Sequence, residues 1–86
     1  MPFSSELVDE LNTLVRFNLE TSQQGIKVHK TAAPEVIAAT RRLHQKGLLT
    51  LADGGYLTGL GRDAAEHAQA LLMILDPAVE VQAKSA

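Results

Sequence analysis

Arg42-Leu-His-Gln-Lys-Gly-Leu-Leu-Thr-Leu-Ala-Asp-Gly-Gly-Tyr-Leu-Thr-Gly-Leu-Gly61 is the stretch that contains the clearest structural signals in this chain. Its basic first residues run into Gly47, which is typical of the last turn of a helix and the residue that stops it. Apolar runs then flank Asp53-Gly54, a step that supplies the positive φ angles of a tight turn, so we expect a β-hairpin over residues 48–58. Thr58 can cap a further helix. The stretch therefore predicts the end of one helix, a hairpin and the start of another helix.

The residues before this stretch predict a helix over 32–46. Thr31 is a suitable N-cap, and Pro34 is tolerated in a first turn. At 100° per residue, one side of this helix is expected to face the core and carries Ala33, Val36, Ile37, Thr40, Leu43 and His44. The opposite, solvent-facing side carries Glu35, Ala38, Arg42, Gln45 and Lys46, with Arg41 at its border.

Three more elements complete the expected order. Leucines and valines at three- and four-residue spacing predict a helix over 5–19, capped by Ser4 or Ser5. The alternation in 26–29 favours a short edge strand, and whether residues 20–30 also hold a helix stays open. Small residues, then large apolar ones, predict a helix over 59–75 that Asp76-Pro77 terminates. The fold class is thus mainly α with a small β-hairpin, in the order helix, short strand, helix, hairpin, helix.

Length and composition set limits on the architecture and location of the protein. The 86 residues suit one small domain, expected over 1–76, and the tail 77–86 has too little hydrophobicity to fold alone. The absence of cysteine excludes disulfides and thiolate metal sites. The longest apolar run, Ala70–Leu75, is far below the roughly 20 residues that span a bilayer. We expect a cytoplasmic protein with no membrane association.

Charge is unevenly distributed along the chain. Residues 27–46 contain five basic residues and one acid, a net charge of +4, whereas the remainder carries −6. A basic patch on an acidic body is typical of a small protein with one anionic partner, although five bases in twenty residues also describe an ordinary solvated surface.

The sequence gives little support for catalysis. The three histidines have no metal-ligand spacing, and the glycines fit neither a P-loop nor a dinucleotide-binding pattern. We interpret His67 as a partly buried structural imidazole and His44 as a packing residue or a partner of the helix C-terminus. The prediction is a protein that is not an enzyme, with no cofactor and no metal.

The expected order of elements over residues 5–75 resembles the winged-helix branch of the helix-turn-helix domains. The run 42–49, continuing into 53–58 and Gly61, is similar to the recognition-helix end, the wing and the last-helix start of MarR-like and PadR-like bacterial regulators. The resemblance places the chain in a small bacterial family that carries such a domain. It implies that helix 32–46 enters a major groove of double-stranded DNA and that hairpin 48–58 is the wing. The protein would then be a DNA-binding, transcription-related factor.

The residue types on helix 32–46 agree with that implication, because arginine and glutamine pair with guanine and adenine. In this hypothesis Arg42 and Gln45 approach bases, while Ala38 and Ala39 allow close contact with base edges. Phosphates would be contacted by Lys27, Lys30, Arg41 and Lys46.

A second hypothesis uses the same fold as a non-catalytic protein–protein interaction module. The basic helix would then dock an acidic partner protein. Only 11 residues separate the first two predicted helices, and the hairpin tip carries an acid rather than a base. Neither feature conflicts with this hypothesis.

The last predicted helix is a candidate for self-association. A small domain has a limited core, and apolar residues occupy several sides of helix 59–75. We expect a homodimer in which Ala65, Leu72 and Met73 contribute to the interface; the alternative is simple burial in the core.

Overall fold

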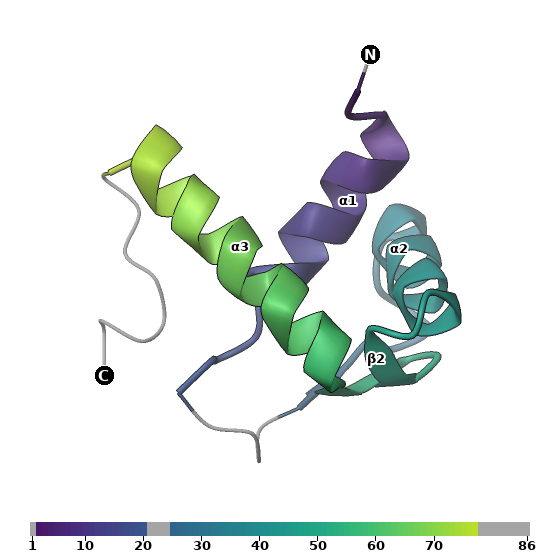
Figure 1. Cartoon of the computed structure of the whole chain (residues 1–86). Coiled ribbons are helices and arrows are strands. Elements are labelled where there is room, and N and C mark those ends of the chain that lie inside the picture. Colours follow the sequence, from purple (N-terminus) through teal and green to yellow (C-terminus); the bar gives the residue numbers. More distant parts are fainter. Residues whose placement is uncertain (1, 21–24, 78–86) are drawn as a thin grey trace.

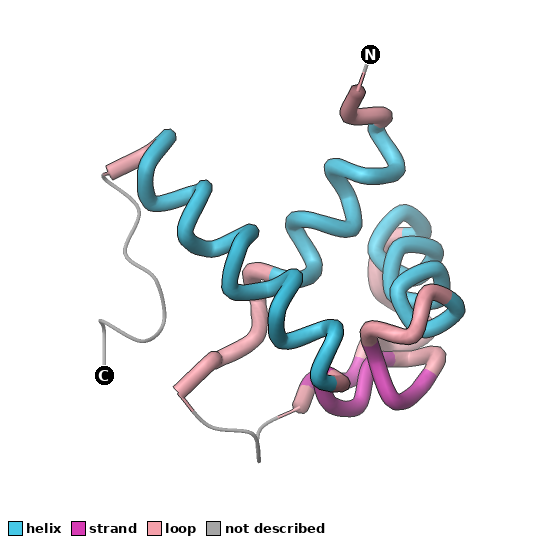
Figure 2. The backbone as a smooth tube through the Cα atoms, viewed as in Figure 1, coloured by secondary structure: helices cyan, strands magenta, loops and turns pink. Residues whose placement is uncertain are grey.

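The computed structural model describes residues 2–20 and 25–77, which form three helices and a small three-stranded antiparallel sheet (Figures 1 and 2). This is a mixed α/β arrangement in which the described part of the connection between the first two helices contains a strand and no helix. The elements are α1 (Ser5–Leu14), β1 (Ile26–Lys27), α2 (Pro34–Gln45), β2 (Leu49–Leu51), β3 (Gly54–Leu57) and α3 (Gly59–Leu75).

The sheet has the order β1-β3-β2, so the predicted edge strand pairs with the second arm of the predicted hairpin. Ile26 pairs with Gly55, and Leu49 pairs with Leu57. The hairpin is confirmed, but its turn differs from the expectation. Asp53 keeps an ordinary φ, while the positive values fall on Gly54 (131°) and Gly55 (71°), which lie inside β3.

Gly54 is needed because β1 crosses close to it, and Gly55 because a Cβ atom there would overlap the Thr50 hydroxyl of β2. A Cβ atom on Gly54 would overlap the carbonyl oxygen of Ile26, and Gly25 lies equally close to the backbone of Gly55. The glycines therefore permit contact between two strand backbones as well as the local turn.

Helix starts follow their local capping signals in two of three cases. The Ser4 hydroxyl accepts a hydrogen bond from the Leu7 amide at 3.2 Å, and the Thr58 hydroxyl accepts one from the Gly61 amide at 3.0 Å. The prediction that Thr31 caps α2 is wrong, because Ala33 occupies the N-cap position and makes no side-chain hydrogen bond. The proline at the first helical position sets this start, since it disfavours helical geometry in the residue before it.

The end of α2 is confirmed at Gly47. The Leu48 amide donates to the Leu43 carbonyl at 2.9 Å, and the Gly47 amide donates to the His44 carbonyl at 3.0 Å. With Gly47 at a φ of 86°, these bonds form a Schellman motif, which satisfies carbonyls that the helix leaves free.

Helix α1 is shorter than the predicted 5–19, because tertiary contacts replace its expected last turn. The buried Gln69 side chain donates to the Phe17 carbonyl at 2.8 Å, and the Arg62 guanidinium donates to the Leu19 carbonyl. Phe17 is buried after the turn that follows α1. The core contains Leu14, Phe17, Leu43, Leu49, Ala65 and Ala68.

Helices α1 and α3 form a V in Figure 1, with the start of α1 and the end of α3 at its open end and the sheet near its closed end. Helix α2 packs beside α1. The predicted stop at Asp76-Pro77 is confirmed, since α3 ends at Leu75. Of the predicted tail, residues 78–86 lie outside the described part. No helix within residues 2–20 and 25–77 is long and apolar enough to cross a membrane.

Candidate functional site

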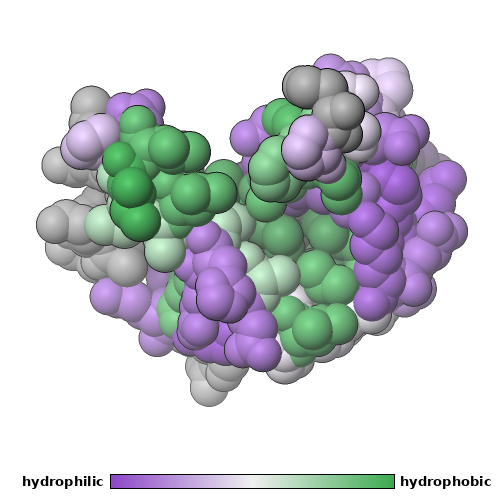
Figure 3. All heavy atoms as spheres, turned by 45° about the horizontal axis from the view of Figure 1, so that its top comes forward, coloured by the Kyte–Doolittle hydropathy of each residue, from purple (hydrophilic) through white to green (hydrophobic). Residues whose placement is uncertain are grey.

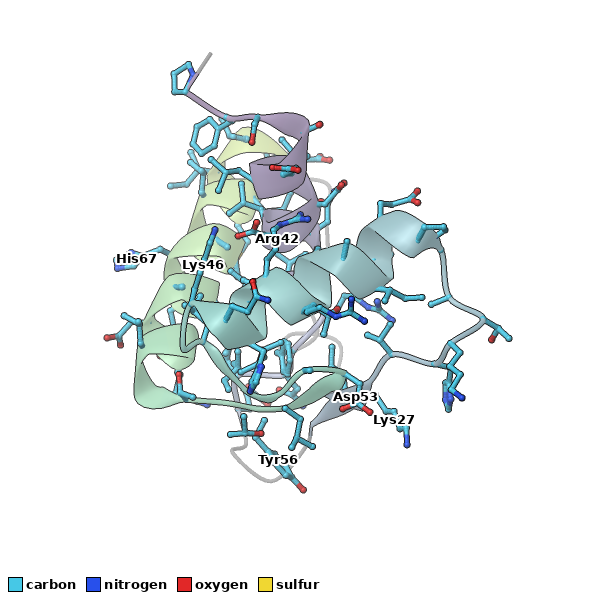
Figure 4. All side chains as sticks on the ribbon, turned by 90° about the vertical axis from the view of Figure 1, so that its right-hand side faces the viewer. Lys27, Arg42, Lys46, Asp53, Tyr56 and His67 are labelled. Carbon is cyan, nitrogen blue, oxygen red and sulfur yellow. The ribbon has the colours of Figure 1, made fainter. Side chains whose placement is uncertain are left out.

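The positive charge of α2 is divided between two places. At the C-terminal end of the helix, Arg42 and Lys46 both face α1 and pair with Glu10 (Figure 4). Arg42 Nε lies 2.7 Å from Glu10 Oε2, and Lys46 Nζ lies 2.5 Å from Glu10 Oε1. A second guanidinium nitrogen of Arg42 donates to the Glu6 carbonyl at 3.1 Å. We call Glu10, Arg42 and Lys46 the Glu10 clamp.

The environment of the clamp favours the charged forms of Glu10 and Arg42. Burial alone would raise the pKa of the Glu10 carboxyl, but hydrogen bonds from Lys46 and Arg42, together with their charges, hold that pKa below its ordinary value. The hydrogen bond to Glu10 in turn raises the pKa of Arg42. Because Glu10 is only 5% exposed, the two cations offset the cost of burying its charge.

The clamp corrects the expectation that Arg42 and Lys46 are free cations on the outer face of α2. The Arg42 side chain is only 26% exposed, and Lys46, although exposed as predicted, is paired with Glu10. Their carboxylate partner comes from a different helix, 32 and 36 residues away, which no local pattern on α2 reveals. One signal was present in the sequence: Glu10 falls between Leu7, Leu11 and Leu14, on the apolar stripe of its own helix. A carboxylate on a buried stripe requires a cationic partner.

The exposed face of α2 follows the prediction apart from Arg42, which is half-buried. Ala38, Arg41 and Gln45 are exposed and recur at i, i+3 and i+7, which places them on one side of the helix. Ala39, by contrast, is fully buried and unavailable to any partner. His67 is exposed, so the prediction that it is partly buried is wrong. His44 is also exposed, which contradicts packing and leaves its place in the last turn of α2 as the remaining interpretation.

On another side of α2, three unclamped cations gather beside β1 and the hairpin turn. Lys27, Lys30 and Arg41 are exposed, and none of the three has an ion-pair partner within the described ranges. Lys30 and Arg41 line a hollow of about 150 Å³, and Lys27 lines an adjoining hollow that shares Lys30. We call Lys27, Lys30 and Arg41 the cationic corner.

The hollow beside the cationic corner has an apolar lining. Val28 and Ile37 contribute to its wall, and His29 and Asp53 lie at the same place. The Val28 amide donates to the Asp53 carbonyl at 2.8 Å, so the hairpin turn is tied to the chain that follows β1. Figure 4 shows Lys27 and Asp53 beside each other near the hairpin, well away from Arg42 and Lys46. The acid of the predicted wing tip thus lies beside the cationic corner.

A separate apolar groove lies between α1 and α3. It has a volume of about 170 Å³ and is lined by Val8, Leu11 and Val15 from α1 and by Leu71, Leu72 and Leu75 from α3, with Asn12 and Ala68. Figure 3 shows hydrophobic side chains gathered over both arms and in the hollow between them. We call this the α1/α3 groove.

The predicted dimer residues fall in different surroundings. Leu72 lines the α1/α3 groove and Met73 is exposed on α3. Ala65 is fully buried in the core of the single chain, so its predicted role in an interface is wrong.

Residues 2–20 and 25–77 contain no group of three histidine or acidic side chains arranged to hold a metal ion. A model of the DUF5669 family, described as a family of unknown function, matches residues 1–76, and the chain therefore belongs to this family. No curated protein and no solved structure gives a significant match.

Proposed function

We propose that this member of the DUF5669 family is a non-catalytic protein-interaction module that binds an acidic segment of a partner protein at the cationic corner. The observation that carries the proposal is the division of charge on α2. Arg42 and Lys46 are committed to Glu10, whereas Lys27, Lys30 and Arg41 are exposed without an ion-pair partner among the described residues.

The chemistry of the corner suits a short acidic peptide that also carries an aliphatic side chain. The hollow beside Val28 and Ile37 offers an apolar contact, and Lys30 and Arg41 stand at its edge. A carboxylate next to the aliphatic residue can pair with the planar guanidinium of Arg41 in a two-pronged geometry. The exposed Lys27 adds charge that speeds encounter with an acidic segment.

Double-stranded DNA is a second candidate partner, in keeping with a winged-helix-like domain. It is favoured by the exposed stripe of Ala38, Arg41 and Gln45, whose residue types suit base contact, with Lys27 and Lys30 left for phosphates. The number of cations is the difficulty. Proteins with strongly salt-dependent DNA binding make about 6–10 phosphate contacts, and the cationic corner supplies three charges with Asp53 among them. Binding of a short acidic peptide requires fewer cations.

Fluorescence anisotropy with the full chain distinguishes the two partners. One probe is a synthetic twelve-residue peptide rich in Asp and Glu with two leucines, and the other is a 20-base-pair duplex, both labelled and both titrated at low salt. The test variant is Arg41→Glu in the cationic corner. The matched control is Arg16→Glu, which makes the same change in charge at another exposed arginine.

We expect the peptide to bind, Arg41→Glu to weaken its binding at least about tenfold, and Arg16→Glu to change it less than about twofold. Failure of the peptide to bind, or equal weakening by both variants, would reject the proposal. Preferred binding of the duplex, with a log–log salt slope near −2.7 for about three phosphates, would favour DNA instead.

A further inference from the structure

The apolar surface of the chain is concentrated at the open end of the V. Among the described residues, seven of the ten large hydrophobic side chains that are exposed lie on the two arms there. These are Phe3, Leu7, Val8, Leu71, Met73, Ile74 and Leu75. Contiguous exposed apolar surface of this kind marks an interaction site.

The α1/α3 groove restricts the nature of its occupant. Within residues 2–20 and 25–77 no charged residue lines it, so a charged partner gains nothing from these walls by entering. Its volume of about 170 Å³ slightly exceeds the 150 Å³ of an apolar cavity that accepts benzene, and this leaves room for one large apolar side chain. The occupant must therefore present an uncharged apolar side chain on a surface that fits between two helices.

The chain itself contains such a surface. The last seven residues of α3, Gln69–Leu75, include no charged residue. Ile74 is 74% exposed and stands three residues after Leu71, on the flank of α3 next to the groove. The occupant and the groove are at the same end of the molecule, as a closed pair with twofold symmetry requires.

We infer that a second copy of this chain closes the α1/α3 groove, with Ile74 of each copy inserted between α1 and α3 of the other. A standard interface buries about 800 Å² on each partner, about 14% of the 5718 Å² surface of this chain, and the two apolar arms form a patch at which it can be centred. The cationic corner lies near the hairpin, away from the open end of the V, so the dimer leaves it accessible. The inference therefore does not depend on the proposed acidic partner.

Sedimentation velocity of the full chain over about 10–500 µM tests the inference. We expect a dimer for the natural chain and at least about a tenfold increase in the dimer dissociation constant for Ile74→Glu, because the variant would bury a charge in the groove. The matched control is Leu60→Glu at the opposite end of α3, where the side chain is 60% exposed and outside the groove. This variant is expected to remain dimeric.

Disulfide formation gives an independent measurement that does not rely on weakening the dimer. The chain contains no cysteine, so a mixture of the Val8→Cys and Ile74→Cys chains can form only the introduced bonds. We expect the disulfide between the cysteines introduced at positions 8 and 74 to predominate over disulfides that join two copies of the same variant. When Leu60→Cys replaces Ile74→Cys, we expect no enrichment of the mixed disulfide.

A natural chain that stays monomeric throughout the concentration range would overturn the inference. Three other results would also overturn it: a dimer that Ile74→Glu leaves intact, an assembly that grows beyond two copies, or a mixture in which the cysteines introduced at positions 8 and 74 form no disulfide. Circular dichroism of each variant confirms that the helices are retained.

Discussion

Glu10 Oε2 on α1 lies 2.7 Å from Arg42 Nε on α2, although the two residues are 32 positions apart in the sequence. Lys46 occupies the other oxygen of the same carboxylate. Through this contact one buried acid joins the first two helices and pairs with two of the cations at the end of α2. The relationship affects both the stability of the fold and the surface available for function.

Replacing Glu10 with glutamine keeps the size of the side chain and removes its charge. We expect Glu10→Gln to lower the free energy of unfolding by about 1–3 kcal/mol, because it loses charge-assisted hydrogen bonds in a largely buried place. Urea unfolding followed by circular dichroism measures the change. Glu6→Gln, at an exposed position on the same helix, should cost less than about 0.5 kcal/mol, and an equal loss in both variants would contradict the role assigned to the clamp.

The same carboxylate predicts how stability depends on pH. Since folding lowers the pKa of Glu10 from its ordinary value of 4.5, the clamp stabilises the folded chain fully above that value and loses its effect as the pH falls through the lower, folded pKa. The stability difference between the natural chain and Glu10→Gln should thus be constant from about pH 7 to pH 5 and shrink below pH 4.5. Urea unfolding at stepped pH measures it. A difference that persists unchanged to about pH 3 would show that another group is responsible.

Gly61 allows α3 to approach the backbone that follows α2. A Cβ atom at this position would overlap the Leu48 carbonyl group, which also accepts a hydrogen bond from the Thr58 amide. We expect Gly61→Ala to destabilise the fold by about 1–3 kcal/mol through overpacking.

Gly59, two residues earlier in α3, is the natural control for that substitution. Apart from its chain neighbours and its own helix backbone, no atom of the described residues lies within 4 Å of a Cβ built there, so Gly59→Ala should stabilise the chain by about 0.5–1 kcal/mol through its helix propensity. Thermal unfolding of both variants measures the contrast, and destabilisation of similar size at the two sites would argue against the close approach.

Gln69 ties α3 to the turn after α1. Its buried side-chain amide donates to the Phe17 carbonyl at 2.8 Å, so Gln69→Leu removes the donor from a buried acceptor. We expect a loss of about 1–3 kcal/mol in the free energy of unfolding by urea. The exposed Gln45→Leu should stay within about 0.5 kcal/mol of the natural chain, and a Gln69→Leu variant as stable as this control would refute the assignment.

Local signals in the sequence were sufficient for most of the secondary structure. The caps at Ser4 and Thr58, the stop at Gly47 and the end before Asp76-Pro77 each depend on a few neighbouring residues. The hairpin depends on a short run in the same way. These features are encoded within three to five positions, and such patterns can be found before any tertiary contact is known.

Features that depend on residues far apart in the sequence could not be predicted from such local patterns. The sequence placed Arg42 and Lys46 among the solvent-facing residues of α2, because a helical wheel shows only the sides of one helix and not the neighbour packed beside it. Packing of α1 brings Glu10 to both cations, and thereby leaves Lys27, Lys30 and Arg41 as the cations of residues 27–46 that have no ion-pair partner among the described residues.

Packing also decided which apolar residues remain outside the core. Ala65 and Leu72 looked equivalent along helix 59–75, yet Ala65 is buried in the core and Leu72 lines the α1/α3 groove. Composition and periodicity determined that this chain forms three amphipathic helices and a hairpin. The angle at which α1 and α3 diverge, which follows from side-chain packing over the whole core, determined where their apolar faces meet and where they stay open to a partner.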